Sequence, residues 1–166
     1  MSRSARSWWL AVGGVIAVLI AGDAASQSAP SVETALQALR AAAPSTTWDA
    51  ASAKAADVTC DGRADRIVVG YERATVWLGV VPGGETAPSR KPFTQRFAVA
   101  RDSQDAFCKV PVRIELQALA CETEDGPLAG CKPVAGCAAF SLVDEDCDAF
   151  HFYWNSEQQS LTGWRR

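Results

Sequence analysis

The stretch from Asp57 to Gly70, DVTCDGRADRIVVG, has the residue types and the spacing of a loop that binds a hard cation. Alternate side chains of a tight loop converge on one point, and calcium takes roughly six to eight oxygen ligands. Gly62 stands where such a loop must turn sharply, which is easiest for a residue without a Cβ. The pattern therefore predicts a calcium site formed by the side chains of Asp57, Thr59, Asp61 and Asp65 and by the backbone carbonyl of Arg63.

This loop differs from an EF-hand. Val68 stands where an EF-hand loop ends in a bidentate glutamate, and a strand-like run follows where an EF-hand needs a helix. Because Thr59 supplies a neutral oxygen, we expect only weak calcium binding. The alternative is a turn of the same shape held by hydrogen bonds and a disulfide, since aspartate caps turns and tolerates left-handed backbone.

The same stretch resembles the calcium loop of FG-GAP and VCBS-type repeats, D-x-[DN]-x-D-G-x-x-D-L-x-V-G. The resemblance implies a calcium ion, a following β-strand, and ligands at Asp57, Asp61, Asp65 and the Arg63 carbonyl. Thr59 departs from the family's Asp or Asn, and Cys60 can tie the loop down covalently. Such repeats usually build propellers from several copies; one copy excludes a propeller here. The end of the chain resembles small secreted bacterial proteins of unassigned function.

All six cysteines follow residue 26, and an even number behind an export signal predicts disulfides. A structural zinc site is not expected, because the chain has no C-x-x-C pair and a single histidine. The spacing leaves many pairings open, and we favour local bridges. These are Cys121–Cys131 around a Gly/Pro-bearing loop and Cys137–Cys147 around a hairpin, which leaves Cys60–Cys108.

Residues 1–26 have the pattern of an export signal. Arg3 and Arg6 precede the apolar run Trp8–Ala21, and small residues follow, with cleavage expected after Ala24 or Ser26. The run is short for a membrane span, although an uncleaved anchor is the alternative. Residues 27–166 then form one domain. With 48% hydrophobic and 21% charged residues the chain is globular, and a net charge of −3 argues against nucleic-acid binding.

The elements that must position these residues are one helix and several strands. Residues 31–43 predict a helix with Ser31 as N-cap, an apolar face, and Pro44 as its end. Residues 44–57 are expected to be irregular, with Trp48 as an anchor, and 82–92 to be an exposed loop. Period-two patterns predict strands at 66–71, 75–81, 93–100, 109–119, 138–143, 149–155 and 160–166. We expect an α+β fold: one N-terminal helix on a largely antiparallel sheet, stapled by disulfides.

Two further groups could carry chemistry. His151 is the only histidine, and although histidine is a common general base, we expect an ordinary sheet histidine. The acidic residues around Cys147 could form a second cation site, but a solvated turn is the favoured interpretation. They are Asp144, Glu145, Asp146 and Asp148.

The aromatic residues Tyr153, Trp154 and Trp164 could bind a sugar or a peptide, or could belong to the core. Because none of the nucleophile or phosphate-loop motifs occurs, we expect a secreted or periplasmic, non-enzymatic binding module with one calcium-type loop. Its partner would be a protein or a glycan, and no membrane contact beyond the signal is expected. The alternatives are a secreted hydrolase using carboxylates or metal, and a periplasmic inhibitor or envelope-assembly partner.

Overall fold

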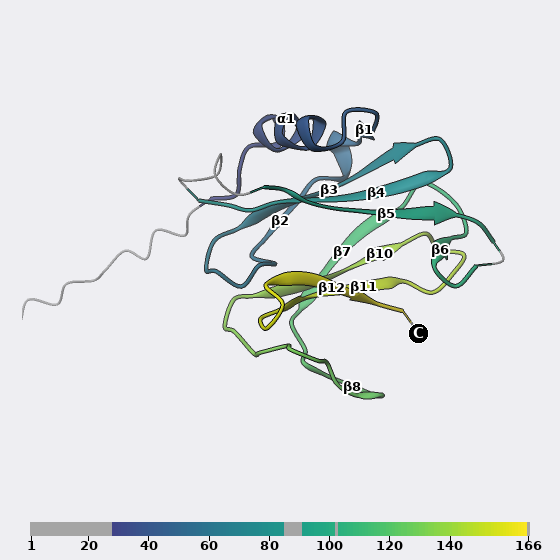
Figure 1. Ribbon diagram of the computed structural model, residues 1–166. Coiled ribbons are helices and arrows are strands. Elements are labelled where there is room, and N and C mark those ends of the chain that lie inside the picture. Colours follow the sequence, from purple (N-terminus) through teal and green to yellow (C-terminus); the bar gives the residue numbers. More distant parts are fainter. Residues whose placement is uncertain (1–27, 85–90, 102, 166) are drawn as a thin grey trace, which may run out of the picture.

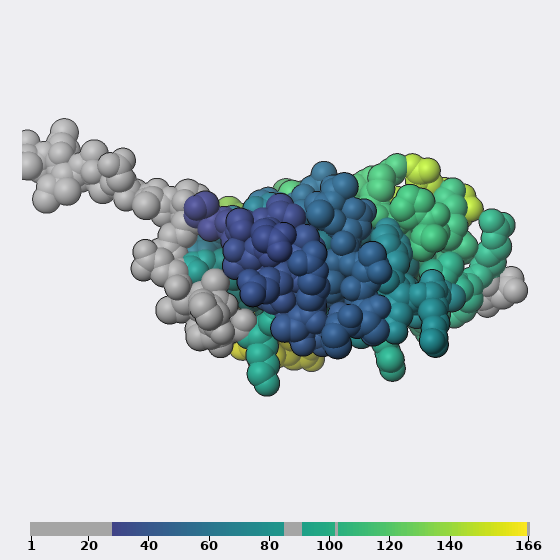
Figure 2. Space-filling model, turned by 90° about the horizontal axis from the view of Figure 1, so that it is seen from above, coloured from purple at the N-terminus to yellow at the C-terminus, as the bar shows by residue number. Residues whose placement is uncertain are grey.

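The computed structural model describes residues 28–84, 91–101 and 103–165, which form three layers (Figure 1). A helix covers the first β-sheet, and the other face of that sheet packs on a second β-sheet. Seen from above, the helix and the residues after it cover the middle of the molecule (Figure 2). The predicted export signal, residues 1–26, lies outside the described residues. Among the described residues no helix is long and apolar enough to cross a membrane.

The two sheets differ in strand order. The first sheet runs β1-β3-β4-β5-β6, with β2 also paired to β3, and the second runs β12-β11-β10-β7. All pairs are antiparallel except β5 with β6. The elements are α1 (Val32–Ala42), β1 (Thr47–Trp48), η1 (Ala50–Ser52), β2 (Lys54–Ala56), β3 (Asp65–Glu72), β4 (Thr75–Val81), β5 (Phe93–Val99), β6 (Ala106–Phe107), β7 (Arg113–Ala118), β8 (Glu122–Thr123), β9 (Gly126–Pro127), β10 (Ala138–Val143), β11 (Phe150–Asn155) and β12 (Ser160–Trp164).

The predicted helix is confirmed. The backbone N–H of Thr34 donates to the Ser31 hydroxyl at 3.1 Å, which caps the helix as expected. Its apolar face, with Leu36 and Leu39, packs on the first sheet. Gly79 of β4 leaves the space that Leu39 occupies, since a side chain at this position would collide with it.

The α+β class is confirmed, and the main core lies between two sheets. β3 and β4 are buried on both faces because the helix covers one face and the second sheet covers the other. The core between the sheets is apolar and rich in phenylalanine: Val58, Ile67, Val69, Val76, Leu78, Val80, Phe97, Phe107, Val112, Ile114, Phe140, Leu142, Phe150 and Phe152.

Three local predictions need correction. Residues 44–57 are not simply irregular: β1, η1 and β2 lie along β3, although Trp48 is buried as expected. The strand predicted at 109–119 begins only at Arg113. The loop predicted at 82–92 starts buried, because the backbone N–H of Gly83 donates to Asp65; residues 85–90 lie outside the described part.

Three disulfides are present, and one of the three favoured pairings is confirmed. Cys121 pairs with Cys131, but the expected Cys137–Cys147 and Cys60–Cys108 bridges are wrong. Cys60 pairs with Cys137 and Cys108 with Cys147, and each of these bridges joins the first sheet's side of the core to the second. No cysteine of the described chain is free. The local-bridge argument failed because cysteines far apart in sequence meet where the two sheets face each other.

Candidate functional site

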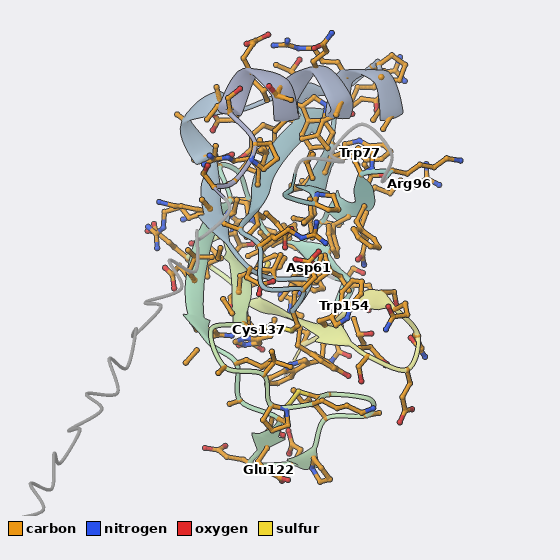
Figure 3. All side chains as sticks on the ribbon, turned by 90° about the vertical axis from the view of Figure 1, so that its left-hand side faces the viewer. Asp61, Trp77, Arg96, Glu122, Cys137 and Trp154 are labelled. Atoms are coloured by element: carbon orange, nitrogen blue, oxygen red, sulfur yellow. A yellow bond between two sulfur atoms is a disulfide. The ribbon has the colours of Figure 1, made fainter. Side chains whose placement is uncertain are left out.

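The loop predicted to bind calcium is held by hydrogen bonds from its own backbone. The carboxylate of Asp57 accepts the N–H groups of Asp61 at 3.1 Å and Gly62 at 2.9 Å. Partial burial raises the pKa of Asp57, and these backbone hydrogen bonds act in the opposite direction. Figure 3 shows Asp61 in the middle of the molecule, between the helix and the hairpin that carries Glu122.

Asp65 is fully buried and joins three segments. Its Oδ2 accepts the N–H groups of Val58 and Thr59, each at 2.9 Å, and its Oδ1 accepts the N–H of Gly83 at 2.9 Å. Burial raises the pKa of Asp65 despite these hydrogen bonds. Both oxygens of this carboxylate are therefore committed to backbone donors.

Asp61 completes the loop by accepting the N–H of Arg63 at 3.0 Å and pairing with the Arg63 guanidinium at 3.3 Å. Among the described residues, the oxygens of Asp57, Asp61 and Asp65 do not form a group within 4.8 Å of one another. This arrangement does not present a ready set of calcium ligands. It matches the alternative of a hydrogen-bonded turn with a disulfide at Cys60, and calcium binding by the loop stays a prediction.

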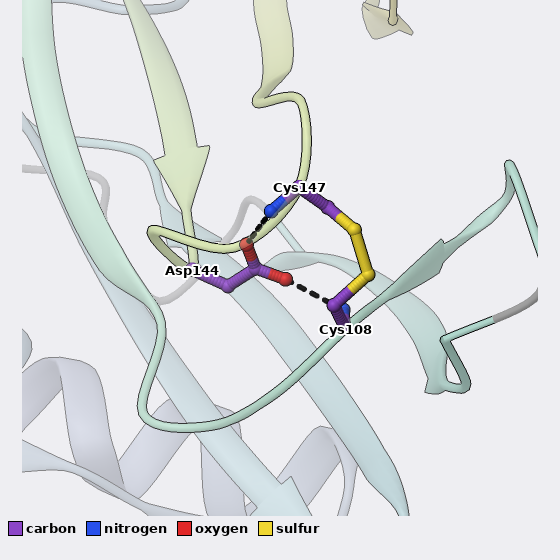
Figure 4. A group of neighbouring side chains, drawn as sticks. All are labelled: Cys108, Asp144 and Cys147. Carbon is purple, nitrogen blue, oxygen red and sulfur yellow. Dashed lines mark hydrogen bonds between the residues drawn. A yellow bond between two sulfur atoms is a disulfide. The ribbon is translucent and has the colours of Figure 1, made fainter.

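The acidic residues around Cys147 also have a structural role (Figure 4). Asp144 is 2% exposed and accepts four backbone N–H groups, those of Cys108, Lys109, Asp146 and Cys147. Burial alone would raise the pKa of Asp144, but the four donors outweigh it and hold the pKa below its ordinary value. Cys108 and Cys147 lie beside this carboxylate, and their sulfurs form a disulfide, which makes them poor metal ligands.

Three of the remaining predicted residues, His151, Tyr153 and Trp164, lie on the outer face of the second sheet. His151 and Ser141 are cross-strand neighbours, and Ser141 Oγ lies 2.8 Å from His151 Nδ1. On the other side His151 stacks on Trp164, with ring centroids 4.4 Å apart and planes 21° apart. His151 is thus the hydrogen-bonded sheet histidine expected from the sequence.

A hairpin stands over this face. It consists of β8, β9 and the flanking residues up to the Cys121–Cys131 disulfide, and Figure 1 shows it projecting from the second sheet. Tyr153 Oη donates to the Ala129 carbonyl at 2.9 Å, and Asn155 Nδ2 donates to the same carbonyl at 3.1 Å. These contacts explain why Tyr153 and Asn155 are each 4% exposed although they lie on the outer face.

Between the hairpin and the sheet lies a groove of about 360 Å³. Ala139, a small residue of β10 on the outer face of the second sheet, lines it. Glu122 and Glu124 come from the hairpin, while His151 and Trp164 come from the sheet. The full lining is Gln117, Ala118, Ala120, Glu122, Thr123, Glu124, Leu128, Ala139, His151, Phe152, Tyr153 and Trp164. Aromatic walls with a few polar groups are typical of ligand sites.

The predicted aromatic trio is only partly brought together. Tyr153 and Trp164 line the groove, but Trp154 points to the opposite side, where it packs edge-on against Phe93 with centroids 5.6 Å apart. Sequence reasoning missed Glu122, Glu124 and Ala139. The one local signal was the pair of cysteines that closes the hairpin. No sequence pattern says that this hairpin lies over His151.

The fold and the groove define a disulfide-stapled β-sandwich that is covered by a helix on one side and carries a hairpin on the other. Comparisons of the chain with protein-family models, with curated proteins and with solved structures found no match.

Proposed function

We propose that this protein is an exported, non-enzymatic binding module that holds its ligand in the groove under the β8–β9 hairpin. The observation that carries the proposal is the groove itself, because aromatic side chains, carboxylates and the small side chain of Ala139 line it from separate elements. The three disulfides support export, since such bonds form and persist in oxidising compartments.

The side chains of the groove suit binding better than covalent catalysis. Ser141 is 4% exposed, and its hydroxyl lies 2.8 Å from His151 Nδ1 across an antiparallel pair of strands. A nucleophile must reach the reacting atom of its substrate, and Ser141 is covered. The described cysteines are all oxidised, so none offers a thiolate.

Weak calcium binding at Asp57, Thr59, Asp61, Arg63 and Asp65 is a separate part of this proposal. Its support is the loop pattern itself, in which acidic residues and Thr59 stand at alternate positions before Gly62. The loop is tied to Cys137 through Cys60, and none of its described residues lines the groove. A bound ion there would stabilise the fold rather than contact the ligand.

A groove-filling variant tests the binding site. Ala139 lies on the outer face, so Ala139→Leu occupies the groove without entering the core between the sheets. Ala98→Leu is the matched control, because Ala98 is an exposed strand residue of the first sheet. The probes are a capped lysine peptide, a capped glutamate peptide and a neutral oligosaccharide, titrated by calorimetry.

We expect saturable binding of at least one probe by the wild type and by Ala98→Leu, weakened about tenfold or more in Ala139→Leu, because the added methylenes exclude the ligand. Failure of all three probes, or equal binding by both variants, would contradict the proposal.

A hydrolase that uses carboxylates is the second candidate, because Glu122, Glu124 and His151 line the same groove. Mass spectrometry of the probe after prolonged incubation separates the two functions. An intact probe supports binding. A cleaved probe, with cleavage lost in Glu122→Gln or Glu124→Gln, would support the hydrolase instead.

A further inference from the structure

We infer that the groove receives the side chain of a lysine or arginine carried by an extended peptide that lies along β7. This inference rests on the proposed function, since it names the ligand of the same groove. Three independent features of the groove carry it: its charge, its aromatic wall, and the strand edge beside it.

Acidic side chains line the groove. The described residues that line it include two carboxylates, Glu122 and Glu124, and neither lysine nor arginine. Glu115, in the same cross-strand row as Ser141, does not line the groove and lies 3.3 Å from Arg113, which also pairs with Glu145. Charge complementarity therefore favours a cationic group and disfavours an acidic one.

The sheet side of the groove is aromatic. Trp164 is half-buried and held in place by its stack on His151. An ammonium or guanidinium group is attracted to an indole face, and the aliphatic stem of lysine or arginine packs on apolar surface while its head stays hydrated. Leu128 and Ala139 offer such a surface in the groove.

The edge of the second sheet favours a peptide as the source of this cation. Among the described strands β7 pairs with β10 alone, so its other side presents unpaired backbone groups. Gln117 and Ala118, at the end of β7, line the groove, which therefore opens beside this edge. An extended peptide could add to the edge and place one side chain in the groove, whereas a free polyamine has no backbone to pair.

The test uses the exported form of the protein and a capped pentapeptide with a central lysine, titrated by calorimetry. Matched peptides carry norleucine or glutamate instead of lysine. We expect the lysine peptide to bind about 5- to 20-fold more tightly than the norleucine peptide. We also expect this preference to shrink as salt rises from about 0.05 M to about 0.5 M. A lysine peptide with a methylated backbone, and spermidine, should bind at least about fivefold more weakly.

Protein variants assign the effect to the groove. Glu122→Gln combined with Glu124→Gln should bring the lysine peptide to within about twofold of the norleucine peptide and leave the norleucine peptide unchanged. Glu33→Gln is the matched control, because Glu33 is an exposed glutamate on the helix at the other side of the molecule.

The outcomes separate the two claims. Equal binding of the lysine and norleucine peptides, or stronger binding of glutamate, overturns this inference. If the peptides that bind the wild type no longer bind Ala139→Leu, the proposed function stands even then. Equal binding of spermidine or of the methylated peptide overturns the peptide as the source. No binding by any probe overturns both claims.

Discussion

Asp65 and Asp144 show how buried carboxylates hold this molecule together. Each is nearly inaccessible, and each accepts backbone N–H groups from segments far apart in the chain. Their pKa values nevertheless move in opposite directions, upward for Asp65, where burial dominates, and downward for Asp144, where the hydrogen bonds dominate. The stability that each contributes therefore depends on pH with opposite sign.

Replacing Asp144 by asparagine should destabilise the protein by about 2–4 kcal/mol at pH 7, because the amide cannot accept all of these N–H groups. The folded pKa of Asp144 is below the unfolded value of 3.8, so its contribution is present above that pH and is lost as the pH falls through the folded value. Urea unfolding of Asp144→Asn and wild type should therefore differ less in acid than at neutral pH.

Asp148→Asn is the matched control for this prediction, since Asp148 is an exposed aspartate of the same turn. It should cost less than about 0.5 kcal/mol. A loss in Asp144→Asn that stays the same at every pH, or an equal loss in Asp148→Asn, would show that the carboxylate is not the source of the stability.

At the scale of elements, the loop between β2 and β3 joins the two sheets. Asp57 accepts, through its backbone carbonyl, the N–H of Ala138 at 2.8 Å, and Cys60 is bonded to Cys137. The loop is therefore anchored at the start of β10 by a hydrogen bond and a disulfide. A calcium ion would add to an arrangement that is already closed.

Calcium should accordingly stabilise the fold only slightly. For a dissociation constant of about 10⁻⁴–10⁻³ M, about 1 mM calcium adds roughly 0.4–1.4 kcal/mol. Melting curves with calcium, magnesium and chelator should show a small calcium-specific rise in wild type that vanishes in Asp61→Ala. Asp125→Ala, on the exposed hairpin, should keep the rise. No rise at about 10 mM calcium would refute the predicted site.

At the scale of the whole molecule, the three disulfides have different structural roles. Cys60–Cys137 and Cys108–Cys147 link the two sheets at opposite ends of β10, whereas Cys121–Cys131 closes the hairpin over the groove. The first two therefore hold the core layers together. The third shapes the proposed binding site.

Removing an inter-sheet disulfide should cost more global stability than removing the hairpin disulfide. On the loop-entropy model, the separation of 77 residues between Cys60 and Cys137 corresponds to about 4.5 kcal/mol, and that of 10 between Cys121 and Cys131 to about 2.7 kcal/mol. Urea unfolding of the two paired Cys→Ser variants measures the difference.

Hydrogen exchange should place the effect of the hairpin variant in residues 120–131, because those residues pack on the sheet only through a few contacts. Loss of the Cys121–Cys131 disulfide should also weaken ligand binding. Equal losses of global stability in the two variants, or unchanged hydrogen exchange in the hairpin, would contradict these separate structural roles.

Local patterns in the sequence determined the elements. Ser31 and Pro44 bound the helix, and period-two alternation located β10, β11 and β12. The cysteine count predicted disulfides, and the short spacing of Cys121 and Cys131 identified one bridge. These features depend on neighbours within a few residues, which is why the sequence alone could reveal them.

The tertiary structure determined which segments of the chain face one another. The period-two pattern is the same whether these later strands extend the first sheet or form a second one. The outcome for β7, β10, β11 and β12 depends on which apolar faces meet. That choice brought Cys60 to Cys137, placed Asp65 beside backbone donors, and brought Glu122 and Glu124 into one groove with Trp164. The groove exists because the hairpin accepts hydrogen bonds from Tyr153 and Asn155, which lie 24 and 26 residues away from Ala129 in the sequence.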